Sequence, residues 1–176
     1  MPYLYRLSPG AILVVKQLRH ALGQVVIKHQ SLRTSLIFDK QNNQLIQQII
    51  DFNDNNNNLF TFIENIFETD EQLNNIIYDE QRNSQHFDLI QGLVFRCHLV
   101  SYKQISSNDL LSDKDLLIFN FHHAIFDCPS MDIFLHDLNQ VYTTDQLTFD
   151  DNTSLRYLDC KYKHIFSSFH FLFLLV

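Results

Sequence analysis

The residues of this chain best suited to chemistry lie together in the segment FNFHHAIFDCPS, residues 119–130. Two adjacent histidines, His122 and His123, end an apolar run, and Asp127 follows four positions after the second. An imidazole has an unperturbed pKa near neutrality, so it can take a proton from an incoming amine or hydroxyl. The same residue types also form metal sites and ordinary polar turns. The spacing alone leaves all three interpretations open.

The strand predicted by the preceding apolar run gives the two histidines different tasks. Successive side chains of a strand point to opposite faces, so His122 and His123 are expected to diverge. One of them is then the working base, and the other packs against the fold. Asp127 is expected to brace the loop, through an ion pair with an arginine or by accepting backbone N–H bonds.

Two other kinds of site compete with a catalytic histidine. A metal site is possible by ligand type, from His122, His123, Asp127 and Cys128, with His98 or His136 nearby. However, adjacent strand histidines diverge, and the chain has no His-x-x-x-His or Cys-x-x-Cys pair that would preorganise two ligands. Cys128 is also a possible nucleophile, because a nearby helix start lowers the pKa of a thiol. Both alternatives rank below proton transfer by a histidine.

Strands and helices in mixed order are predicted to position this segment. Apolar residues spaced by three and four predict helices over 12–29, 70–85 and 129–142, the last with Pro129 in its first turn. Aromatic and β-branched runs predict strands at 3–7, 59–64, 93–101 and 116–121, and a hairpin from 31–38 and 45–50. The run 116–121 is almost entirely apolar, which is typical of a strand buried on both faces. A buried strand is therefore expected to lead into the histidine pair.

Length, charge and cysteine content narrow the class of protein. The 176 residues suffice for one domain, or for a piece of a larger one. A net charge of -7 disfavours nucleic acid, whose binding needs clustered lysines and arginines. Three widely spaced cysteines predict no disulfide framework, and residues 1–10 carry no secretory signal, so a reducing, cytoplasmic location is expected. The apolar run IFSSFHFLFLLV at 165–176 is shorter than the ~20 residues that span a membrane.

The histidine segment resembles the signature of the condensation domains of non-ribosomal peptide synthetases, His-His-x-x-x-Asp-Gly with a serine two positions beyond. HHAIFDCPS matches at His122, His123, Asp127 and Ser130, and departs at Cys128, where the family has glycine. Cysteine would strain this turn if the backbone there needs a positive φ. Further similar blocks follow the family's order: HQSLRTS with His29 and Arg33; HFDLIQGLVFR with Phe87, Asp88, Leu89, Gly92, Leu93 and Arg96; and the Tyr-rich LRYLDCKYKHI at 155–165. Arg96 is expected to face water unless it meets Asp88 or Asp127.

The resemblance implies an α+β fold, a mixed-sheet two-layer lobe of the chloramphenicol-acetyltransferase-like type, in which two lobes enclose a tunnel. In this family an acyl and an aminoacyl group, each a thioester on the phosphopantetheine of a carrier protein, form an amide in the tunnel. His123 would be the catalytic residue, as a base on the amine or as a stabiliser of the tetrahedral intermediate. His122, Asp127, Arg33 and Ser130 would support the site, Asp127 as an ion-pair partner. No metal or redox cofactor is implied.

The similar blocks cover an N-terminal lobe alone, residues 1–165 without the family's opening helix, and residues 166–176 form an atypical apolar tail. The expected partners are carrier proteins and a C-terminal lobe or adjacent synthetase domains; neither nucleic acid nor a membrane is expected. Weak activity or none is expected of the isolated chain. The alternatives are an epimerising or ester-forming relative on the same fold, and a non-catalytic remnant that binds a carrier protein or a neighbouring domain.

Overall fold

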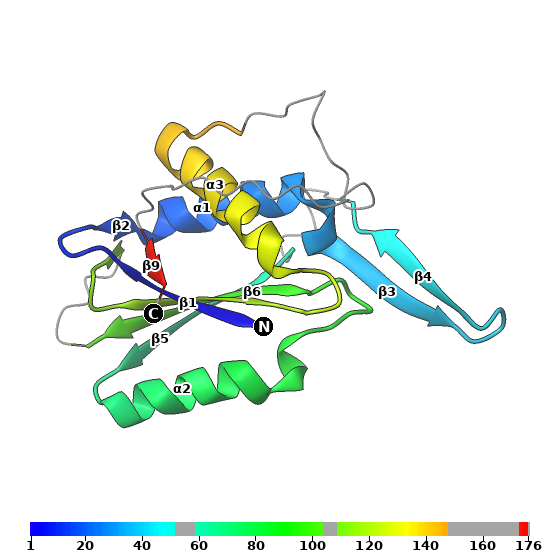
Figure 1. Cartoon of the computed structure of the whole chain (residues 1–176), viewed down its shortest axis with the longest axis horizontal. Helices are drawn as coiled ribbons and strands as arrows, with labels where there is room; N and C mark the ends of the chain where they lie inside the picture. The colour runs from blue at the N-terminus through cyan, green and yellow to red at the C-terminus, as the bar shows by residue number, and fades with distance from the viewer. Residues whose placement is uncertain (52–58, 104–108, 148–172, 176) are drawn as a thin grey trace.

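The computed structural model describes residues 1–51, 59–103, 109–147 and 173–175, arranged around a five-stranded mixed sheet (Figure 1). The strand order is β5-β6-β8-β1-β9. These strands are β5 (Thr61–Phe67), β6 (Phe95–Tyr102), β8 (Leu116–Phe121), β1 (Pro2–Leu7) and β9 (Phe173–Leu175). β5 runs parallel to β6, and the other neighbours are antiparallel. The parallel pair is joined through helix α2 (Asp70–Arg82), since parallel neighbours need a crossover connection.

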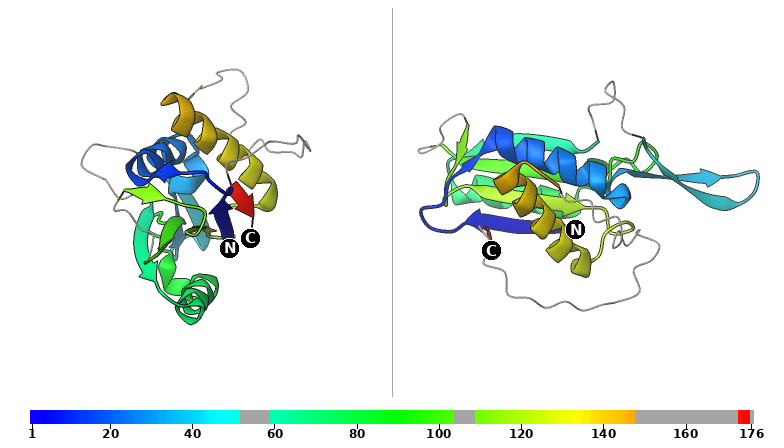
Figure 2. Two further views of the ribbon diagram at one scale, coloured as in Figure 1. Left: turned by 90° about the vertical axis from the view of Figure 1, so that its left-hand side faces the viewer. Right: turned by 90° about the horizontal axis from the view of Figure 1, so that it is seen from above.

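Helices cover both faces of this sheet (Figure 2). α1 (Val15–Lys28) and α3 (Cys128–Thr144) pack on one face, over Phe95, Phe119 and Phe121. α2 packs on the other face through Leu73, against a smaller apolar cluster. The mixed α+β class is confirmed. The expected two layers become three, because the central strand β8 is buried along its whole length and presents apolar side chains to both faces.

Local sequence accounts for where the helices begin and end. α1 starts later than expected, because Leu13–Val14 form the short strand β2, which pairs with β7 (Leu110–Leu111). The helix then buries one stripe of apolar side chains and ends at Lys28. α2 begins where the hydroxyl of Thr69 accepts the N–H of Gln72, an ordinary N-cap. The predicted helices 70–85 and 129–142 are thus confirmed, with shifted ends.

The predicted hairpin forms an arm that extends away from the sheet (Figures 1 and 2). Its strands are β3 (Thr34–Asp39) and β4 (Gln44–Ile49), paired antiparallel with Ile37 opposite Ile46. Residues 31–33 belong to a 3-10 turn, Gln30–Arg33, instead of the first strand. We call residues 34–49 the arm.

The glycine-containing segment 88–93 contacts the base of the arm, which we call its root: residues 34–36 and the adjoining Ile50. The N–H of Leu36 donates to the carbonyl of Leu89 at 2.8 Å, and the hydroxyl of Ser35 donates to the carbonyl of Ile90 at 2.6 Å. Gly92 has a φ of +68°, and a Cβ there would lie 2.4 Å from the side chain of Ile50. Glycine is therefore needed at this position both for its backbone angle and for the close approach of the arm's root.

Part of the apolar tail takes part in the sheet. β9 pairs antiparallel with β1, with Tyr5 opposite Leu175 and Leu7 opposite Phe173. Residues 166–172, the Tyr-rich segment 155–165 and most of the asparagine tract 51–58 lie outside the described residues. Within the described ranges, no helix is both long and apolar enough to cross a membrane.

Candidate active site

The histidine loop, residues 122–127, connects the buried strand β8 to helix α3. The N–H of His122 still donates to the carbonyl of Val94 at 2.9 Å, which extends the sheet pairing one residue past β8. Ile125 and Phe126 are buried, and the ring of Phe126 stacks on Phe121 with centroids 3.8 Å apart. Both residues therefore anchor the loop in the core. The loop therefore has rigid attachments at both ends.

The two histidines lie on the same side of the loop, so the prediction that they diverge is wrong. Their rings stack, with centroids 4.7 Å apart and planes inclined by 25°. The strand ends at Phe121, so the pair lies beyond the pleat that would have alternated the side chains. His122 is half-buried and meets the ring of Phe87 edge-on at 5.5 Å, whereas His123 is exposed. One histidine packs, as expected, and it supports the other from beside it.

The surroundings of His122 favour its neutral form. Burial lowers its pKa, and the positive charges of protonated His123 and of the N-terminal amino group lower it further. Its Nδ1 accepts the N–H of Ala124 at 3.3 Å, which leaves Nδ1 without a proton. His122 is thus a neutral ring beside an accessible imidazole.

Asp127 caps helix α3 instead of forming the expected ion pair. Its Oδ1 accepts the backbone N–H of Ser130 at 3.1 Å and also the hydroxyl of Ser130. Among the residues that the structure describes, no cation lies within ion-pair distance of Asp127. An N-cap of this kind contributes about 1 kcal/mol to stability. Asp127 and Ser130 thus fix the far end of the histidine loop, which is the bracing by backbone N–H that the sequence left open.

Cys128 is the first residue of α3, and Pro129 follows it in the first turn. Positive φ angles outside glycine occur, within the described backbone, at Asn43 and Asp145. A helical residue has a negative φ, so the strain expected from replacing glycine by cysteine is absent here. The side chain of Cys128 lies outside the described part of the chain.

The other histidines considered as metal ligands have other contacts. His98 is buried, with Nδ1 at 2.7 Å from Glu80, and His136 lies 3.4 Å from the carboxylate of Asp137. In the described portion of the chain, no three His, Cys, Asp or Glu side chains are placed to hold a metal ion. The metal interpretation therefore has no geometric support there.

Arg33 and His29 connect elements at the end of α1. The guanidinium of Arg33 donates to the carbonyls of Ile27 and Ile50, which joins this end of α1 to the root of the arm. His29 lies 2.7 Å from the buried carboxylate of Asp137 on α3. Burial alone would raise the pKa of Asp137, but hydrogen bonds and charge from His29 and Lys28 lower it to about 2. Both motif residues therefore position helices, and His29 holds the helix that follows the histidine loop.

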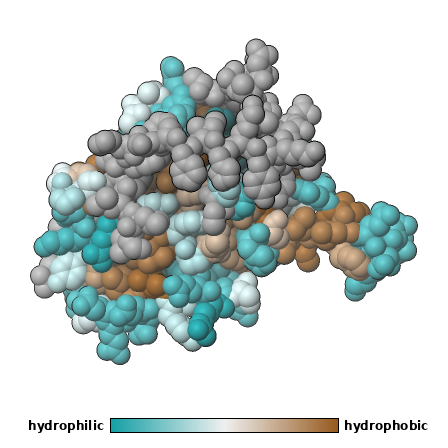
Figure 3. Space-filling model, viewed as in Figure 1, coloured by the Kyte–Doolittle hydropathy of each residue, from teal (hydrophilic) through white to brown (hydrophobic). Residues whose placement is uncertain are grey.

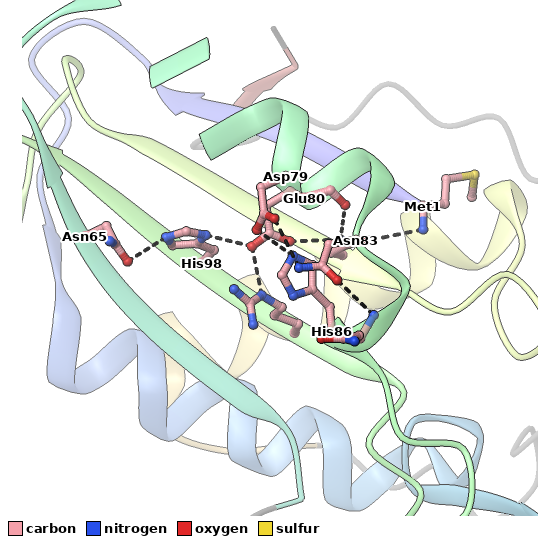
Figure 4. Close-up of polar contacts among 10 residues, drawn as sticks. Met1, Asn65, Asp79, Glu80, Asn83, His86 and His98 are labelled. Atoms are coloured by element: carbon pink, nitrogen blue, oxygen red, sulfur yellow. Dashed lines mark hydrogen bonds and ion pairs between the residues drawn. The ribbon is translucent and has the colours of Figure 1, made fainter. Parts of the chain in front are cut away.

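A buried polar network lies between α2 and the sheet, on the face opposite to α1 and α3 (Figure 4). This network was not predicted from the sequence. Arg96 was expected to face water, but it is buried and donates from Nε to Glu80 at 2.8 Å. Asn120 donates to the second oxygen of Glu80 at 2.8 Å, and the ring of His98 bridges Glu80 and Asn65. We call Glu80, Arg96, His98, Asn120 and Asn65 the Glu80 network. The available signal was the alternation of Arg96 and His98 in an otherwise apolar strand, which places both on the α2 face.

Glu80 remains ionised in this network. Burial alone would raise its pKa, but hydrogen bonds from His98 and Asn120, together with the charge and hydrogen bond of Arg96, lower that pKa to about 2. The residue is 3% exposed, and both oxygens of its carboxylate have donors. It is thus unsuited to proton transfer near neutral pH, and it fastens α2 to the sheet.

Comparisons with known proteins agree with the motif blocks. A profile of the family described as Condensation domain matches residues 10–163. Surfactin synthase subunit 2 of Bacillus subtilis is 30% identical over 133 residues, covering 76% of this chain and 3% of the relative. Cyclo-acetoacetyl-L-tryptophan synthase of Aspergillus oryzae is 27% identical over 128 residues, covering 73% of this chain and 3% of the relative. The chain thus spans a small part of the curated proteins it matches.

Solved structures show the same fold. The epimerization domain from the third module of tyrocidine synthetase B superposes with a TM-score of 0.64 at 19% identity, covering 82% of this chain and 30% of that one. The condensation domain of the Monacolin K polyketide synthase gives 0.63 at 14% identity, covering 85% and 30%. The X-domain in complex with OxyB from teicoplanin biosynthesis gives 0.54 at 27% identity, covering 81% and 27%. This chain therefore covers between 27% and 30% of those three chains.

Proposed function

Because this chain belongs to the condensation-domain family, we propose that it supplies the N-terminal lobe of an acyltransferase that forms an amide from carrier-bound acyl and aminoacyl thioesters. The observation that carries the proposal is the placing of His123. Its imidazole is exposed, it stacks on a neutral His122, and its loop is anchored in the core on both sides. Such a group is accessible to a substrate and held by rigid neighbours.

The chemistry requires one proton transfer and accurate positioning. The acceptor amine attacks the thioester carbonyl, a C–N bond forms, and the C–S bond breaks. His123 takes the proton from the attacking nitrogen and returns it to the departing thiolate, so the imidazole ends as it began. A thioester is already activated towards an amine, so holding both reactants in contact supplies much of the acceleration. Because His122 is neutral, it does not repel the positive charge that His123 carries while it holds the proton.

The proposed partners follow from this reaction. Each thioester would be carried on the phosphopantetheine of a carrier protein, and a C-terminal lobe or an adjacent synthetase domain would complete the tunnel. In this proposal residues 1–165 form the lobe and 166–176 an additional tail. Among the described residues, Cys97 is a buried cysteine that forms no disulfide. A free thiol is compatible with the reducing cytoplasm, which is the location we propose.

The proposal is tested by mixing the chain with a C-terminal lobe and two loaded carrier proteins, and measuring the amide product by mass spectrometry. His123→Ala should lower product formation by about 100-fold or more. His20→Ala is the matched control, because His20 is exposed and pairs with Asp145 at the opposite end of α3. Equal product from wild type and His123→Ala overturns the proposal, and so does a folded wild-type mixture that makes no product.

A second candidate is a module that binds without catalysis. It is favoured by the structural likeness to the X-domain, whose solved structure is a complex with OxyB. Under this alternative, carrier binding measured by calorimetry persists in His123→Ala while no condensation product forms with wild type. An ester-forming or epimerising relative would instead show His123-dependent product with a hydroxyl acceptor, or inversion of the aminoacyl centre.

A further inference from the structure

The arm presents apolar side chains to solvent on both of its faces. Figure 3 shows it as a hydrophobic projection with a hydrophilic tip. The exposed fractions range from 36% to 64% for Ile37, Phe38, Leu45, Ile46 and Ile49. Phe38 and Leu45 are opposite one another on one face, and Ile37 and Ile46 on the other. An exposed apolar hairpin is unusual for a surface in contact with water, and it indicates an interaction site.

The outer edge of β4 is open, unlike that of β3. The N–H of Ile50 donates to Arg33, and antiparallel pairs alternate, so Ile46 and Gln48 direct their backbone groups towards β3. The backbone groups of Leu45, Gln47 and Ile49 therefore point outwards. On the other side, the edge of β3 is occupied where Leu36 donates to Leu89. No described strand pairs with the outer edge of β4, which leaves a template for another strand.

Few charged residues lie around this edge, and charges of opposite sign lie at its two ends. The arm carries two charged residues, Asp39 and Lys40, both at its tip, and Asp51 follows its root. Asp39 is used within the tip, because its carboxylate accepts the N–H of Gln41 at 2.8 Å. Lys40 and Asp51 have no ion-pair partner among the described residues. Opposite unpaired charges thus lie at the two ends of β4.

We propose that β4 pairs antiparallel with β4 of a second copy of this chain, on a twofold axis at Gln47. In this register Gln47 faces its own counterpart, and Leu45 faces Ile49 of the second copy. These are the residues whose backbone groups point outwards, so each pair can exchange two hydrogen bonds. The two hairpins then form one continuous four-stranded sheet.

This register also satisfies the side chains. Leu45, Ile49 and Phe38 lie on the same face of the hairpin, so pairing Leu45 with the second copy's Ile49 joins two apolar patches into one. Asn43 comes opposite Asp51 of the second copy, and Lys40 begins the same turn as Asn43. Lys40 is thereby brought near Asp51 of the second copy, and the twofold axis repeats this contact with the two copies exchanged. The overall charge of -7 opposes association elsewhere, whereas β4 itself carries no charge.

The pairing predicts a specific pattern of amide hydrogen exchange, measured by NMR on the full chain as its concentration is raised. The N–H groups of Leu45, Gln47 and Ile49 should become protected with rising concentration, in step with dimer formation seen by sedimentation. The N–H groups of Ile46 and Gln48 already bond within the hairpin, so their exchange serves as the internal control. A chain that remains monomeric, or protection without this alternation, overturns the inference.

Charge reversal tests the register. Lys40→Glu and Asp51→Lys should each weaken dimerisation by roughly fivefold, and the double variant should restore it, because two exposed ion pairs are reversed together. Lys114→Glu is the matched control, since this exposed residue lies outside the arm. Equal weakening by the control overturns the register. If the outward N–H groups of β4 become protected from exchange only after a C-terminal lobe is added, then β4 pairs with that lobe, and self-pairing is overturned. The inference does not depend on the proposed catalytic function.

Discussion

The Glu80 network and the histidine loop both adjoin the central strand β8, and they use polar residues in opposite ways. The network includes Asn120 within this strand, and the loop follows its last residue, Phe121. In the network, Glu80, Arg96 and Asn120 are all buried, and Arg96 and Asn120 both donate hydrogen bonds to the carboxylate of Glu80. In the loop, His123 is exposed and its neighbour His122 is kept neutral by its surroundings. The first arrangement holds a helix on the sheet, and the second leaves an accessible group free to react.

The difference follows from the cost of desolvating polar groups. A buried charge must be fully paired, so its partners become part of the fold and have no capacity left for a substrate. A catalytic base must keep an unsatisfied site in contact with solvent or substrate. In this chain the more conspicuous cluster of charge, around Glu80, therefore maintains structure, and the proposed chemistry belongs to the exposed side chain of His123.

The largest expected effect is the loss of Glu80. Glu80→Ala leaves Arg96, His98 and Asn120 buried without their acceptor, and should lower the free energy of unfolding by about 3–5 kcal/mol. Denaturant unfolding followed by circular dichroism measures it. Glu71→Ala is the control, because Glu71 is exposed in the first turn of the same helix and should cost less than about 1 kcal/mol. Equal effects of the two variants would show that the network is not a stabilising centre.

Acid should weaken the fold through the same carboxylate. The pKa of Glu80 is lowered from 4.5 to about 2, so its contribution is present above pH 4.5 and is lost as pH falls towards 2. The lowering corresponds to roughly 3 kcal/mol. Unfolding free energies measured across this range should fall less steeply for Glu80→Gln than for wild type. Parallel curves would contradict the lowered pKa.

The cap of α3 should have a smaller effect. Asp127→Ala removes the acceptor for Ser130 and should cost about 1 kcal/mol, measured as a lower melting temperature. Asp127→Asn retains a capping oxygen and should be nearly neutral. An arginine partner, which is one of the two possibilities that the sequence left open, would instead make the asparagine variant as damaging as the alanine one.

The smallest effect on stability is expected at His123. Its side chain is exposed and its described contact is the stacking on His122, so His123→Ala should change the unfolding free energy by less than about 0.5 kcal/mol. Thermal unfolding of both proteins measures the difference. A substantial loss of stability would place His123 in the same class as Glu80 and end the contrast between the two regions.

Much of the scaffold could be predicted from the sequence. The apolar periodicity of α1 and the almost entirely apolar run of β8 predict those elements because burial requires such patterns. The position of the histidine pair after a buried strand was predicted for the same reason. Helix ends were less accurate, since caps and short bridges such as β2 depend on contacts from distant segments.

The side-chain geometry of the site was harder to predict. Strand alternation was applied one residue too far, and so the stacking of His122 on His123 was missed. The partner of Arg96 was missed because Glu80 is one acidic residue among several on α2, and only the packing of the helix on the sheet selects it. For Asp127 the sequence left open an ion pair and backbone N–H bonds, and the structure shows the second, as a cap that needs only local backbone.

The central claim, that chemistry resides in the histidine loop and structure in the Glu80 network, is tested most directly by a single-turnover rate per folded molecule. The chain is combined with a C-terminal lobe and loaded carrier proteins, and the folded fraction of each variant is measured in parallel. The account predicts that His123→Ala lowers this rate by about 100-fold or more, whereas Glu80→Gln lowers stability and leaves the rate unchanged. An unchanged rate for His123→Ala would contradict it.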